Sequence, residues 1–152
     1  MLLEALIAIV IFSIGILAIV GLQANSIRMS TDAKFRSDAN LLANQYISTM
    51  WADIASATTA AGAFSSAEFA PYTTGGTNFI NWYNTAVVPA LPSGASAAVT
   101  ANTILLCGNI VSATCTGNQQ NSVTNVTVAL SWQLPGGDVH SYSTDTIISA
   151  QK

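Results

Sequence analysis

Residues 1–23 read MLLEALIAIVIFSIGILAIVGLQ, and this stretch decides the fold. It is built mainly from Leu, Ile, Val, Ala, Phe and Gly, and no charged residue occurs from Ala5 to Ser26. As a helix, the 18 residues from Ala5 to Leu22 are about 27 Å long, close to the thickness of the hydrocarbon core of a bilayer. Glu4 stands at the very start of this run. A carboxylate at the edge of a membrane-length helix needs a physical reason.

The composition of the whole chain limits the classes of function. With 152 residues, the chain is long enough for one modest domain with a buried core. Charged residues make up only 7%, far below the roughly 25% of an ordinary soluble domain. The four basic residues, Arg28, Lys34, Arg36 and Lys152, form no basic patch, and the net charge is −3. Nucleic acid is therefore not expected as a partner.

Two ordinary interpretations of the first residues explain them incompletely. A cleavable signal peptide begins with positive charges, whereas this segment begins with a negative one. A simple transmembrane anchor fits the length but gives Glu4 no role. The nearest basic residues follow the apolar run, which by the positive-inside tendency would keep that side cytoplasmic. The disulfide predicted below favours the opposite orientation, with that side in an oxidising compartment. We expect that a basic leader has been removed before residue 1, which resolves this conflict.

The segment resembles the N-terminus of type IV pilins after prepilin peptidase has acted. That family has a short basic leader, a cleavage after Gly, and an apolar helix with Glu at the fifth mature position; here the Glu is fourth. Three later stretches look like the PilV-type minor pilins: ANLLANQYISTMWAD (39–53), Trp82 followed by ALPSG (90–94), and VALSWQLPGGDVHSY (128–142). The resemblance implies that Met1 carries the N-methylated amine and that Glu4 meets the amine of a neighbouring subunit during assembly.

Elementary electrostatics leaves two roles open for Glu4. A lone carboxylate costs about 2.5–3.5 kcal/mol at mid-bilayer and less near the interface. A positive partner at about 4 Å offers on the order of 4 kcal/mol at an effective dielectric constant of 20, before desolvation is subtracted. Pairing between subunits is thus strong enough to decide where the helix sits. The alternative is that Glu4 lies at the interface and stabilises the helix N-terminus through the macrodipole.

The apolar helix is expected to continue into the head of the protein. Phe35, Ala39, Leu42, Tyr46 and Met50 follow helical spacing, and the stripe is widened by Ala43, Ile47, Trp51 and Ile54. The pattern predicts one helix to about Ile54 whose second half covers a sheet. Gly15 and Gly21 are candidate points of bending or close helix contact. We divide the chain into an apolar helix (1–24) and a pilin head (25–152) that includes the second half of the helix.

Strand signals concentrate near the end of the chain. Residues 55–76 read as a loop region, and residues 78–88 as a short amphipathic helix that ends at ALPSGAS. NTILLCG (102–108) is a short apolar strand, and VTVALSW (126–132) alternates. LPGGD (134–138) predicts the turn of a hairpin whose second strand is 139–148. We expect Val128 and Trp132 to pack against the long helix, giving an α+β fold of the type IV pilin kind: a long N-terminal helix on a C-terminal antiparallel sheet.

Cys107 and Cys115 have seven residues between them in CGNIVSATC. This is not the spacing of a zinc site, and the single histidine, His140, does not complete a set of four ligands. The two residues are either two free thiols or, as we predict, a disulfide that closes a short loop in an oxidising compartment.

Searches for a catalytic or metal site find nothing. The sequence contains no P-loop, GxSxG or HExxH pattern. His140 is expected at a solvated strand position, and Asp138 and Asp145 are weak evidence for a calcium site. We therefore expect no enzyme activity, no cofactor and no resident metal.

The sequence predicts a structural subunit that forms homo- or hetero-oligomers with other pilin subunits in a helical filament. Before assembly it would span the inner membrane once, with its head in the periplasm, as a substrate of prepilin peptidase. After assembly it would lie in an extracellular pilus, where adhesion and motility are the associated functions. A pseudopilin of a type II secretion system is the alternative, and a membrane-anchored periplasmic enzyme or binding module is a more distant one.

Overall fold

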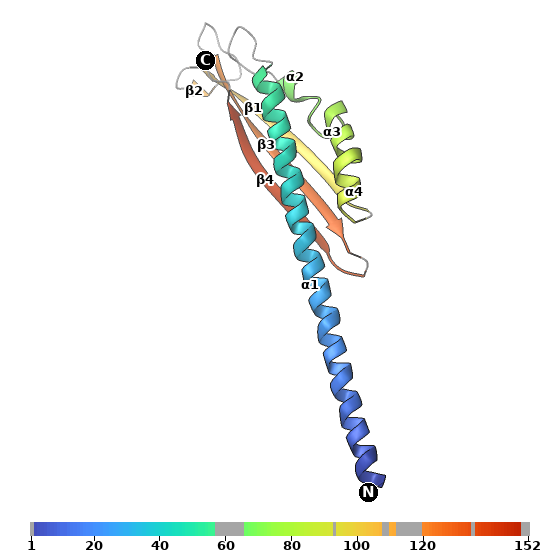
Figure 1. Cartoon of the computed structure of the whole chain (residues 1–152). Coiled ribbons are helices and arrows are strands. Elements are labelled where there is room, and N and C mark those ends of the chain that lie inside the picture. Colours follow the sequence, from blue (N-terminus) through green and yellow to red (C-terminus); the bar gives the residue numbers. More distant parts are fainter. Residues whose placement is uncertain are drawn as a thin grey trace. The chain divides into compact units, whose positions relative to one another are not determined.

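The computed structural model describes residues 2–56, 66–92, 94–107, 110–111, 120–134 and 136–149. Residues pack into two compact units, Met1–Ser37 and Asp38–Lys152. One helix, α1 (Leu2–Ser56), begins in the first unit and ends in the second (Figure 1). The predicted boundary between the apolar helix (1–24) and the head (25–152) separates the membrane segment from the periplasmic part, which is a different division from these two units. It stays a prediction.

The second half of α1 has the predicted amphipathic face. Within the second unit, one side of the helix is buried and consists of Ala39, Leu42, Ala43, Tyr46, Ile47, Met50 and Ile54. The prediction was wrong for Trp51, which is 37% exposed. Trp51 is one step of about 100° beyond the fully buried Met50 around the helix, so its side chain falls at the margin of the buried face. The predicted end near Ile54 is confirmed.

Along the chain, short helices connect α1 to the first strand of the sheet. The predicted loop region over 55–76 contains a four-residue helix, α2 (Ser66–Phe69), followed by turns. The predicted amphipathic helix is confirmed as α3 (Thr77–Trp82), continued by a π-helical turn, η1 (Tyr83–Val87), and by α4 (Val88–Ala90). Pro89 lies in this last piece and has no N–H to donate. The wider turn before it, in which the Val88 N–H bonds to the Tyr83 carbonyl, accommodates the proline ring without ending the helix.

The sheet is antiparallel and has the strand order β2-β1-β3-β4. Its strands are β1 (Ser96–Cys107), β2 (Ile110–Val111), β3 (Gln120–Gln133) and β4 (Val139–Ser149). The predicted hairpin is confirmed: β3 pairs with β4 in a register that sets Gln133 opposite Val139. β1 begins six residues earlier than the predicted strand. Its first half is rich in Ala and Ser, which have little strand signal of their own, but it pairs with β3 from Ser96 onward.

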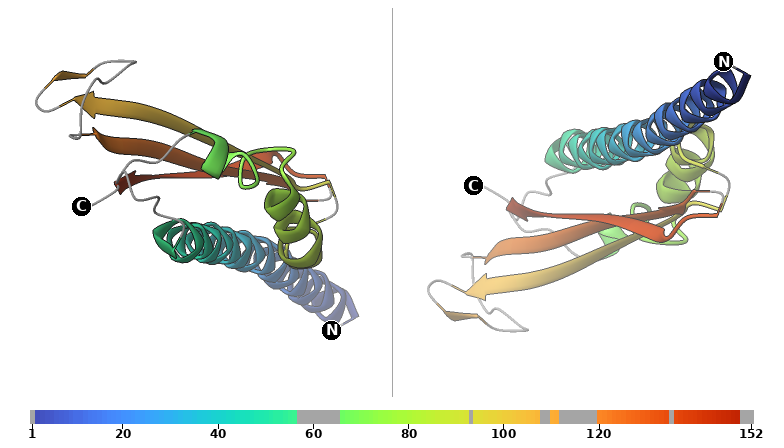
Figure 2. Two further views of the ribbon diagram at one scale, coloured as in Figure 1. Left: turned by 90° about the horizontal axis from the view of Figure 1, so that it is seen from above. Right: turned by 90° about the horizontal axis from the view of Figure 1, so that it is seen from below.

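One face of the sheet forms the core with the helices. Its buried side chains are Val99, Thr124, Val126, Val128, Leu130, Trp132 and Ile148. The second half of α1 and the α3 helix both lie on this face (Figure 2). The predicted burial of Val128 and Trp132 is confirmed, with exposed fractions of 0% and 1%. A long N-terminal helix and an antiparallel sheet make this an α+β structure with the arrangement of the type IV pilin fold.

An aromatic cluster joins α1 to α3. The Tyr46 ring stacks on Trp82 with 4.2 Å between centroids, and the Tyr46 hydroxyl donates a 2.8 Å hydrogen bond to the Tyr72 carbonyl. The Tyr72 hydroxyl in turn donates to the Asp53 carboxylate at 2.6 Å. Burial, with the hydrogen bond to Asp53, raises the pKa of Tyr72 to about 12, and burial with the nearby Tyr72 raises the pKa of Tyr46. These contacts hold α1 against α3 and against the turn that precedes α3.

The turn between α2 and α3 covers part of the edge of β1. The Thr74 hydroxyl accepts a 2.7 Å hydrogen bond from the Val99 N–H, and the Thr74 N–H donates to the Val99 carbonyl at 3.0 Å. Gly76 makes this turn possible, because a Cβ there would lie 2.3 Å from the Pro71 carbonyl oxygen. Gly76 is therefore required by a close approach of backbone to backbone.

Candidate assembly site on the N-terminal helix

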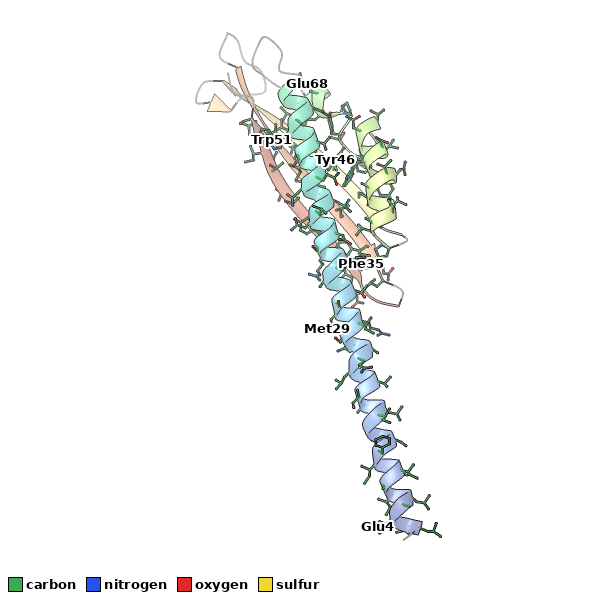
Figure 3. The ribbon with its side chains drawn as sticks, in the orientation of Figure 1. Glu4, Met29, Phe35, Tyr46, Trp51 and Glu68 are labelled. Carbon is green, nitrogen blue, oxygen red and sulfur yellow. The ribbon has the colours of Figure 1, made fainter. Side chains whose placement is uncertain are left out.

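The first half of α1 exposes apolar side chains around its whole circumference. Figure 3 shows side chains projecting from both edges of the helix in this region. The exposed large residues are Leu2, Leu3, Leu6, Ile7, Ile9, Val10, Ile11, Phe12, Ile14, Ile16, Leu17, Ile19, Val20, Leu22 and Ile27. A helix that is apolar on all sides is stable only inside a membrane or inside a larger assembly.

Hydrogen bonding within this segment also suits an apolar environment. The Ser13 hydroxyl donates to the Ile9 carbonyl at 2.8 Å, and the Thr31 hydroxyl donates to the Ile27 carbonyl at 2.8 Å. Neither hydroxyl therefore needs water. By length and composition, α1 is the one described helix that is apolar enough to cross a membrane. The helix is compatible with membrane anchoring.

Glu4 is exposed and lies in the first turn of α1. Its position fits both roles predicted for it, since a carboxylate there faces the positive end of the helix macrodipole and is open to a neighbouring chain. Met1, the predicted partner in assembly, lies outside the described residues. The pairing between Glu4 and an amine stays a prediction.

Three cations follow the apolar run, and they differ in their surroundings. The Arg36 Nε lies 3.2 Å from the Asp32 carboxylate, an ion pair at helical spacing. The Lys34 Nζ stands 5.6 Å from the centroid of the Phe35 ring. Arg28 is exposed, and no partner is found for its side chain within the described part of the chain. The ion pair was not predicted, although Asp32 and Arg36 stand four residues apart on the helix, a spacing that favours such pairs.

The structure describes one of the two cysteines of the predicted disulfide. Cys107 is the last residue of β1, opposite Ile110 of β2. Cys115 lies outside the described residues. The disulfide stays a prediction.

The hairpin does not provide the metal site for which Asp138 and Asp145 were considered. The Asp145 carboxylate accepts a 2.6 Å hydrogen bond from Thr127 across the sheet. Among the described residues, no group of three or more His, Cys, Asp or Glu side chains lies close enough together to hold a metal ion. His140 is partly buried and stacks on Trp132 with 6.0 Å between ring centroids. The expectation of a solvated His140 was wrong, because its strand position places it opposite the largest side chain of the core.

Nothing matches this chain in comparisons with family models, with curated proteins and with solved structures. The function of the protein is therefore inferred from the geometry of α1 and of the head.

Proposed function

We propose that this protein is a structural subunit of a type IV pilus filament, of the PilV-like kind, assembled through the apolar half of α1. The observation that supports the proposal is the exposed apolar surface of residues 2–27 on a helix whose second half belongs to a head with its own core. A bilayer covers such a surface before assembly. Once the helix has left the lipid, only the helices of neighbouring subunits can cover it.

Two further features favour a filament over a simple anchor. Glu4 begins the apolar run, where an ordinary anchor has no need of a carboxylate. The chain also has few charges, and a nearly uncharged surface limits like-charge repulsion between closely packed heads. The head would lie in the periplasm before assembly and on the outside of the filament afterwards. Prepilin peptidase would prepare the N-terminus, and the partners would be other pilin subunits.

A pseudopilin of a type II secretion system remains the second candidate, since its apolar segment would have the same properties. The two are distinguished by where the chain is found. Cells that produce the full chain are sheared, and the filaments are collected by sedimentation and probed for this subunit. A pilus subunit is recovered in the sheared filaments. A chain found only in detergent-soluble membrane would contradict the proposal and would favour the pseudopilin or an anchored periplasmic module.

A further inference from the structure

The uncharged part of α1 is bounded by one acidic and one basic side chain. No charge occurs between Glu4 and Arg28, and both residues are exposed on the same helix. Arg28 is 24 positions after Glu4, which corresponds to about 36 Å along a continuous helix. The apolar segment is thus a rod with a negative charge near its first residue and a positive charge just beyond its other end.

Neither charge has a partner within its own chain, as far as the described residues extend. Of the described cations, Arg36 is bound to Asp32, and Lys34 stands over Phe35. Arg28 is the first cation after the apolar run, and its guanidinium offers five N–H donors to another molecule. A guanidinium is weakly hydrated and matches the geometry of a carboxylate, so it suits a partly apolar contact better than an ammonium does.

Copies anchored in one membrane with their heads on the same side run in the same direction. At equal height, Glu4 would lie beside Glu4, and Arg28 beside Arg28, so that like charges repel. A shift of only a few residues would set Glu4 beside the N-terminal amine of the other copy. Larger shifts within the apolar run leave the carboxylate against the uncharged apolar surface of its neighbour, where it lacks a counter-charge. A shift of about 36 Å brings Glu4 level with Arg28 of the other copy.

We propose that Arg28 is a second intersubunit partner of Glu4, and that this pair sets an axial shift of about 36 Å between two copies of the chain. The inference rests on the proposed function. It is compatible with the contact between Glu4 and an N-terminal amine, because that contact joins copies shifted by only a few residues. A carboxylate has two oxygens, and it accepts hydrogen bonds from both partners.

Cross-linking of assembled filaments tests the shift directly. Leu3→Cys and Ile27→Cys are introduced together, since both side chains are exposed and each precedes one charge of the proposed pair. Leu3→Cys with Leu17→Cys is the matched control, at a shift of about 21 Å. A short bismaleimide should link subunits in the first variant and leave the control at the level of the unsubstituted chain. Filaments that cross-link equally in both, or only in the control, would overturn the shift.

Charge substitutions test the pair itself, with membrane abundance and incorporation into filaments measured separately. Arg28→Gln should lower incorporation roughly tenfold or more at unchanged abundance, and Arg28→Lys should recover part of the loss. Arg36→Gln is the control and should incorporate normally, since Arg36 already has Asp32 as its partner. If Glu4→Gln prevents assembly while Arg28→Gln does not, this inference fails and the proposed function stands. If the unsubstituted chain never enters filaments, both fail.

Discussion

Replacing Trp132 by Ala should unfold the head at much lower temperature than the same replacement at Trp51. Trp132 is 1% exposed and Trp51 is 37% exposed, so the two substitutions delete the same atoms from a fully buried and from a partly exposed position. Truncation of a fully buried Trp costs about 3–5 kcal/mol. The Trp132 indole N–H has no hydrogen-bond partner among the described residues, so no hydrogen bond is lost with the ring. The ring contact with His140 places the expected loss toward the upper part of that range.

The loss can be measured on the full chain in detergent micelles by far-ultraviolet circular dichroism. At roughly 4 °C per kcal/mol for a head of this size, Trp132→Ala should lower the Tm by about 12–20 °C. Trp51→Ala should change it by only a few degrees. Equal shifts for the two variants, or an unchanged Tm for Trp132→Ala, would refute the packing of the hairpin against the helices as the source of stability.

Three other predictions follow from the head. Gly76→Ala should destabilise it by about 2 kcal/mol or more, because the new Cβ meets backbone atoms, whereas Gly137→Ala should be tolerated; urea unfolding compares the two. The pKa of Tyr72 is raised to about 12, so its contribution to stability is complete below about pH 10 and is lost as the pH rises through 12. The Tm should fall over that interval, and less steeply in Tyr72→Phe; identical pH profiles would contradict the role of the hydroxyl. Mass spectrometry without reduction should find Cys107 joined to Cys115, a bond that stabilises by roughly 2–3 kcal/mol, and two free thiols would exclude it.

The helix and the hairpin were predictable because their signals are local. The apolar spacing from Ala39 to Met50 and the alternation from Val126 to Trp132 each repeat often enough to fix one face of an element. The first half of β1 was missed because its Ala and Ser residues acquire strand structure only by pairing with β3. Periodicity also failed at Trp51, at the margin of the buried face, where a side chain points partly to solvent.

The candidate site was predictable only in part. Glu4 stands out in the sequence because it is the one acidic residue next to the long apolar run. Asp32 lies four residues after Arg28 and four residues before Arg36, so spacing alone does not decide which cation it binds. The structure pairs it with Arg36. The bond from Tyr72 to Asp53 and the stacking of Tyr46 on Trp82 join residues far apart in the chain, so no local pattern predicts them.

The central claim is that Glu4 directs assembly through its charge. In the most direct test, Glu4→Gln is expressed as the only copy of the subunit. Its level in the membrane and its incorporation into filaments are then measured separately. The variant should reach the membrane at a normal or higher level, since a charge has been removed from the apolar segment, while incorporation fails or slows. A role limited to the helix macrodipole predicts a loss of only about 0.3–1 kcal/mol in helix stability, with filaments still formed. Normal incorporation at normal membrane abundance would contradict the pairing role of Glu4.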